Sequence, residues 1–163
     1  MIFEKQWQAN AETLASMKTS LLTAVATGLL LSPCGGESGG SGKARSLLGK
    51  WTCVAATVDG KLLPEKTVQE LRLTVTRDRY TTMKGTETLF DSTYRLNTAV
   101  SPTRIYLLGN EGDLTGKEAE GIFSLETDTL TICYAMPGDP PPTKFVSSPG
   151  SNAYLVSWRR VTP

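Results

Sequence analysis

Leu71-Arg72-Leu73-Thr74-Val75-Thr76 alternates apolar and polar residues at every position, and Thr129-Leu130-Thr131-Ile132-Cys133-Tyr134 repeats the alternation in the second half of the chain. A period of two places the apolar side chains on one face of an extended segment and the polar side chains on the other. Both stretches therefore predict half-buried antiparallel strands.

Six further segments carry shorter or less regular strand patterns: 51–58, 80–86, 89–96, 103–108, 120–125 and 154–160. Turn-forming residues such as Asp59-Gly60 and Lys84-Gly85 separate them. The one helix that we expect is a turn or two over 64–70, with Pro64 at the first helical position. Eight short strands with tight connections predict an all-β fold, an eight-stranded antiparallel up-and-down barrel, whose closure removes exposed strand edges.

One connection is longer than the others and rich in proline. It runs over 137–152 and contains Pro137, Pro140, Pro141, Pro142 and Pro149. Proline fixes φ and cannot donate to a strand ladder. We expect a stiff, extended segment that crosses a barrel mouth or follows the barrel wall.

The N-terminal region is predicted to be an export signal. The apolar run 21–31 is too short to span a bilayer of about 30 Å but has the size of a signal-peptide core. Lys18 precedes this run directly after Met17, whereas residues 1–16 lack a positive balance, so we expect translation to start at Met17. The predicted organisation is a signal-peptide region with its helix over 1–33, a flexible Gly/Ser-rich tether over 34–46 and a barrel over 47–163.

Cys34 is the candidate attachment point for a lipid. Leu31-Ser32-Pro33-Cys34 resembles the lipobox of bacterial lipoproteins, although Pro33 stands where a small residue is usual. This resemblance implies lipidation of Cys34, a membrane anchor and a location in the cell envelope. Ordinary signal cleavage that leaves a free thiol, and an uncleaved anchor, are the two alternatives.

Composition narrows the function classes. Of 163 residues, 39% are hydrophobic and 20% charged, which argues against a disordered polyelectrolyte and a polytopic membrane protein. A net charge of +1 gives no electrostatic reason to bind nucleic acid. The chain has no histidine, and it therefore lacks the commonest general base and metal ligand. We expect no enzyme activity, no cofactor and no metal.

The two ends of the barrel sequence resemble the lipocalin arrangement. Gly49-Lys50-Trp51 opens the first predicted strand and Arg159-Arg160 closes the last. In lipocalins a tryptophan of this kind packs across the closed end of the barrel against an arginine of the final strand. The resemblance implies that Gly49, Trp51, Arg159 and Arg160 close the barrel, with a cation–π contact between guanidinium and indole.

The C-terminal half resembles a bacterial lipocalin-like domain family that is expanded in planctomycetes. The residues that carry this resemblance are 121–125, 128–134, Pro137-Gly138, Pro142-Thr143-Lys144-Phe145 and Pro149-Gly150-Ser151. The likeness extends over about 47–160, and Pro141 replaces an arginine that is usual in the family. It implies a small calycin-like barrel, often secreted or lipid-anchored, of generally unassigned activity.

Two groups of residues have alternative readings. Cys53 and Cys133 form one disulfide in an oxidising compartment, or each is a small buried hydrophobe; we favour the second reading. Carboxylates gather around one Gly-rich loop, and a solvated acidic hairpin is a better reading than a calcium site because the spacing matches no known binding loop. These carboxylates are Glu111, Asp113, Glu118 and Glu120.

We therefore expect a non-enzymatic envelope lipoprotein, acting as a monomer, whose barrel binds a small hydrophobic ligand. The residues expected to contact it face inward from alternate strand positions: Leu71, Leu73, Val75, Phe90, Tyr94, Ile132 and Tyr134. The alternative is a structural or protein-interaction domain with a packed interior, because eight strands enclose either a filled core or one small ligand. The two functions differ in whether nine aromatic side chains fill the core or line a ligand cavity, and core filling is the default expectation. These residues are Tyr80, Phe90, Tyr94, Tyr106, Phe123, Tyr134, Phe145, Tyr154 and Trp158.

Overall fold

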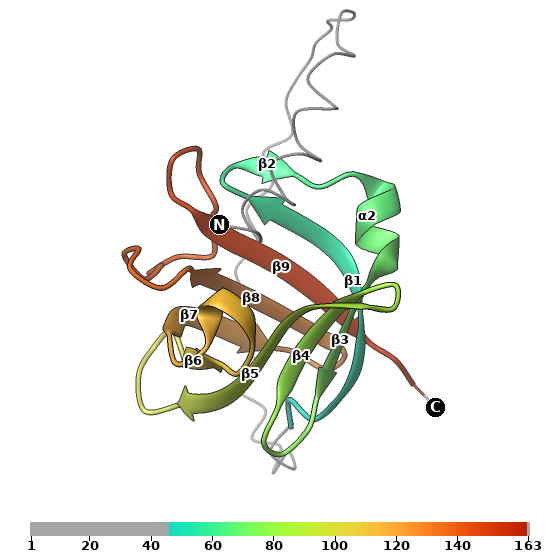
Figure 1. Cartoon of the computed structure of the whole chain (residues 1–163), viewed down its shortest axis with the longest axis horizontal. Helices are drawn as coiled ribbons and strands as arrows, with labels where there is room; N and C mark the ends of the chain where they lie inside the picture. The colour runs from blue at the N-terminus through green and yellow to red at the C-terminus, as the bar shows by residue number, and fades with distance from the viewer. Residues whose placement is uncertain (1–45, 163) are drawn as a thin grey trace, which may run out of the picture. The chain divides into compact units, whose positions relative to one another are not determined.

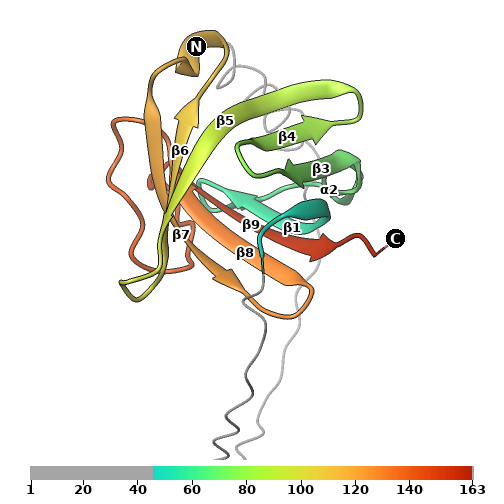
Figure 2. The ribbon, with the colours of Figure 1, turned by 90° about the horizontal axis from the view of Figure 1, so that it is seen from below.

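The fold is a closed barrel of eight antiparallel strands with one extra short strand (Figures 1 and 2). The computed structural model describes residues 46–162. The predictions for 1–45, including the signal peptide, the tether and Cys34, lie outside these residues. The elements are β1 (Gly49–Val58), β2 (Lys61–Leu62), α2 (Glu65–Glu70), β3 (Leu71–Val75), β4 (Tyr80–Lys84), β5 (Glu87–Asn97), β6 (Arg104–Gly109), η1 (Gly112–Leu114), β7 (Glu118–Leu125), β8 (Thr129–Ala135) and β9 (Ala153–Arg160).

Each strand pairs with its neighbour in sequence, apart from the short β2, and β9 closes the ring on β1. Trp51 lies opposite Arg160 and Val58 opposite Tyr154 along this seam. The predicted all-β, up-and-down barrel is thus confirmed, and each of the eight predicted strands overlaps one observed strand. β2 is the additional strand, and it extends the edge of β1 beside α2.

The core lies inside the barrel, where the apolar side of each alternation points. Its fully buried members include Trp51, Leu73, Ile105, Ile132 and Trp158. Side chains of this size fill the interior of an eight-stranded barrel. The Nε1 atom of Trp158 is the only buried side-chain nitrogen or oxygen within residues 46–162 that has no hydrogen-bond partner.

Two bulges change the alternation along the strands. The pairing of β1 with β9 slips between Cys53 and Ala55, and that of β4 with β5 slips between Thr82 and Met83. A bulge inserts one residue and bends its strand. As a result Ala55, which strict alternation with Trp51 and Cys53 would turn inward, is exposed, and Ala56 is buried instead.

The proline-rich connection follows the outer wall of the barrel. Beneath it, Ile122, Cys133 and Ala153 form a small second core on the outer face of β7, β8 and β9, and Phe145 and Leu155 pack against it. The hydroxyl of Ser147 donates to the carbonyl of Ala153 at 2.7 Å. These three strands are therefore buried on both faces where the connection covers them.

The predicted helix is present but begins one residue later than expected. Pro64 precedes α2 in an extended conformation, and the amide of Val68 donates to its carbonyl at 3.0 Å. Val68 is the buried residue of the helix, which contacts β1 and β4. Within the described residues, no helix has the length and apolar character needed to cross a membrane.

Candidate binding cleft

Trp51 and Arg160 cap one end of the barrel. The guanidinium carbon of Arg160 lies 4.1 Å from the centroid of the Trp51 ring, which is a cation–π contact. The same guanidinium donates to the carbonyls of Leu48 at 2.7 Å and Ser46 at 2.8 Å. Gly49 has φ +138°, and a Cβ there would lie 3.0 Å from the Arg160 guanidinium. The chain therefore needs glycine at this position to let the arginine reach the indole.

Arg159 does not take part in this cap. It is exposed, and neighbouring residues of a strand face opposite sides of the sheet. Of the four residues expected to close the barrel, the structure thus brings together Gly49, Trp51 and Arg160.

A cleft of about 670 Å³ opens at the same end, between the start of the described chain, the β5–β6 connection and the end of β7. Aliphatic and aromatic side chains form its walls, and hydroxyl groups are interspersed among them. The lining residues are Ser46, Leu47, Tyr94, Leu96, Thr98, Ser101, Pro102, Thr103, Phe123, Ser124, Leu125 and Phe145.

Only one of the seven predicted ligand contacts, Tyr94, lines this cleft. Its hydroxyl donates to the carbonyl of Thr76 at 3.0 Å. Leu71, Leu73, Val75 and Ile132 are at most 3% exposed and belong to the packed core.

The two remaining predicted contacts, Phe90 and Tyr134, also lie away from the cleft lining. Phe90 is buried. The ring of Tyr134 stacks on that of Tyr154, with 5.1 Å between the centroids. The ligand contacts expected at the strand centres are therefore mostly residues that pack against one another.

The cleft residues that the strand pattern did not select include Leu47, Leu96 and Leu125. Leu96 and Leu125 are among the last residues of β5 and β7, and Leu47 precedes β1. Phe123 and Phe145 belong to the aromatic set considered from sequence. Leu96 and Leu125 end the predicted strands 89–96 and 120–125, and this terminal position is the signal that could have placed them near a barrel opening.

Neither thiol has the environment of a nucleophile. Cys53 and Cys133 are free and buried, so no disulfide joins them. Burial raises the pKa of the Cys53 thiol to about 11. Burial also raises the pKa of Cys133, whose thiol donates to the carbonyl of Val146 at 3.6 Å. Both thiols are protonated at neutral pH, and the thiolate is the reactive form.

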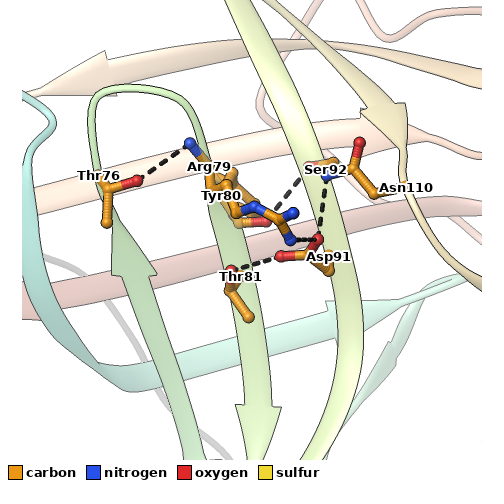
Figure 3. Close-up of polar contacts among 7 residues, drawn as sticks. All are labelled: Thr76, Arg79, Tyr80, Thr81, Asp91, Ser92 and Asn110. Atoms are coloured by element: carbon orange, nitrogen blue, oxygen red, sulfur yellow. Dashed lines mark hydrogen bonds and ion pairs between the residues drawn. The ribbon is translucent and has the colours of Figure 1, made fainter.

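Asp91 is a buried carboxylate on the outer face of β5 (Figure 3). It forms an ion pair with Arg79 and accepts hydrogen bonds from Thr81 at 2.7 Å and Asn110 at 3.0 Å. These partners come from the β3–β4 turn, from β4 and from the segment after β6. Because its oxygens already have three donors, Asp91 joins these elements and has a structural role.

The acidic residues around the β6–β7 connection do not converge on a metal site. Glu118 pairs with Arg95 at 2.9 Å, and Glu120 pairs with Arg104. Arg95 also lies over the ring of Tyr106, 3.6 Å from its centroid. Among residues 46–162 no three His, Cys, Asp or Glu residues are placed to hold a metal ion.

Comparisons of the chain with protein families, with curated proteins and with solved structures found no match.

Proposed function

We propose that this protein is a non-enzymatic binding module of the cell envelope that takes a small, mainly apolar molecule into the cleft beside Trp51 and Arg160. The observation that carries the proposal is the cleft itself. Its volume of about 670 Å³ falls within the usual range of small-molecule sites, roughly 300–1,000 Å³. The lining combines aliphatic and aromatic side chains with hydroxyl-bearing ones, and polar groups that converge among apolar side chains are typical of such sites. The resemblance to lipocalin-like domains implies the barrel but no ligand, so the binding role rests on the cleft.

The test uses two leucines of equal exposure. Leu96 lines the cleft and is 40% exposed, whereas Leu108 lies on the outer face of β6 and is 41% exposed. In a titration of the full chain with an apolar fluorescent probe, we expect Leu96→Ala to weaken binding by about tenfold, because it removes apolar contact area. Leu108→Ala should bind as the wild type does. Equal effects of the two substitutions would overturn the cleft as the binding site.

A second experiment looks for the natural ligand. Native mass spectrometry of the full chain from its own membrane fraction should detect a retained small molecule, and Leu96→Ala should lower its occupancy. The packed core is also consistent with the second candidate function, an interaction domain of the envelope. If the wild type binds no apolar probe at all, this second function is the better explanation.

The envelope location is part of the same proposal and rests on the lipobox-like sequence that ends at Cys34. The mass of the mature N-terminus tests it. We expect a diacylated Cys34 as the first residue. An unmodified first residue elsewhere would refute lipidation and leave the binding proposal standing.

A further inference from the structure

The described lining of the cleft carries no formal charge. All twelve described lining residues are aliphatic, aromatic, proline, serine or threonine. A ligand with a charged group would therefore lose hydration there without gaining an ion pair from these side chains. Burying an unpaired charge is costly, so the lining favours uncharged molecules.

Three described cations adjoin lining residues in sequence: Arg95, Arg104 and Lys144. Arg95 is paired with Glu118 and Arg104 with Glu120, whereas Lys144, beside Phe145, is exposed to solvent. The Arg160 guanidinium lies over Trp51 and holds the carbonyls of Ser46 and Leu48. Each of these three arginines would have to leave its contacts to neutralise an anionic ligand.

Asp78 places a negative charge near one side chain of the cleft. The pKa of Tyr94 is raised, first by burial and then by the nearby carboxylate of Asp78. A ligand carboxylate beside Tyr94 would experience the same repulsion, because like charges oppose each other's ionised forms.

The hydroxyls of the cleft can recognise an uncharged polar group. The side chains of Thr98, Ser101, Thr103 and Ser124 form no hydrogen bond with another residue of 46–162. A hydroxyl both donates and accepts, and it can therefore bond to an alcohol or an ester carbonyl. The apolar walls would hold the hydrocarbon part of the same molecule.

We propose that the cleft selects an uncharged amphiphile, a hydrocarbon chain with a hydroxyl- or ester-bearing head, over a fatty-acid anion of equal chain length. This inference rests on the proposed binding function and specifies its ligand class. Each methylene removed from the chain should weaken binding by about fourfold, as expected for buried hydrocarbon.

The test compares monolauroylglycerol with laurate, both below their aggregation concentrations, at pH 8 on the full chain. We expect the glycerol ester to bind at least about tenfold more tightly, because laurate buries an unpaired charge. Equal affinities, or tighter binding of laurate, would overturn the ligand class and leave the binding function intact. Binding of neither probe would overturn the proposed function itself.

A charge-adding pair of variants supplies the control. Thr98 lines the cleft and is exposed, whereas Thr93 is exposed on β5 and does not line it. Thr98→Lys should raise the affinity for laurate by about tenfold, since it supplies the missing cation. Thr93→Lys should change neither affinity. If Thr98→Lys fails to improve laurate binding, the lack of a cation does not explain the selectivity and the inference is wrong.

Discussion

The inner and outer faces of the barrel wall are built from the same strands, yet they are buried by different means. Inside, side chains of the strands form the buried core, in which Leu73 and Ile132 are fully buried. Outside, most of the wall is exposed, and the proline-rich connection covers an apolar part of it around Ile122 and Cys133. How much a side chain contributes to stability therefore depends more on which face of the barrel wall it lies on than on its chemical type.

The largest expected difference between the faces is in leucine packing. Leu73 is fully buried inside, and Leu108 is 41% exposed outside. Leu73→Ala should destabilise the protein by about 3–5 kcal/mol, because it leaves a cavity in a packed core, and Leu108→Ala by about 0.5 kcal/mol. Urea unfolding measures both. Similar losses for the two variants would mean that the interior relaxes around the cavity and is less tightly packed than the structure indicates.

The inner thiol should make stability depend on alkaline pH. Burial raises the pKa of Cys53 from 9.0 to about 11, so the folded state holds this proton more tightly than the unfolded chain does. The resulting stabilisation is complete below pH 9 and is lost as the pH rises toward 11.

Between pH 8 and pH 10.5, the wild type should therefore lose about 2 kcal/mol more unfolding free energy than Cys53→Ala. Other groups contribute to the pH dependence in this range, among them Tyr80, whose pKa in the folded state is raised by burial and, to a lesser degree, by Cys53. The difference between the two proteins cancels the contributions that do not involve Cys53. Parallel pH dependences would show that water reaches Cys53 inside the barrel.

The smallest contrast involves two adjacent arginines on opposite faces. Arg160→Ala removes the contact with Trp51 and the bonds to Ser46 and Leu48, and we expect it to cost about 1–2 kcal/mol. Arg159→Ala, at an exposed site, should change stability by less than about 0.5 kcal/mol. Thermal unfolding of both variants tests this order, and a reversed order would assign the cap to the wrong arginine.

Alternation was enough to predict the strands because the barrel buries one face of each. Leu71, Leu73 and Val75 point inward as their period of two requires. The outer core was less predictable, since Cys133 occupies a polar position of the alternation and is buried because the proline-rich connection after β8 folds back over it. Similarly, the bulge after Cys53 depends on how β1 pairs with β9, and the pattern of residues within β1 does not predict that pairing.

The cleft could not be predicted from the sequence for a related reason. Its walls come from the segment before β1, from β5, from the β5–β6 connection, from β7 and from the proline-rich connection, and only barrel closure brings these together. The residues at strand centres that looked suited to a ligand are the ones that fill the narrow middle of the barrel. Tyr94 is both a predicted ligand contact and a lining residue of the cleft, because it lies near the end of β5, where the packed core ends and the opening begins.

The pairing of β1 with β9 also indicates that the barrel can be circularly permuted. Arg160 bonds to the carbonyl of Ser46, so the first and last described segments of the barrel lie side by side. Domains whose ends are adjacent tolerate circular permutation. A short linker from 162 to 46, with new ends opened in the exposed turn at Gly85-Thr86, would keep every strand in its place in the ring.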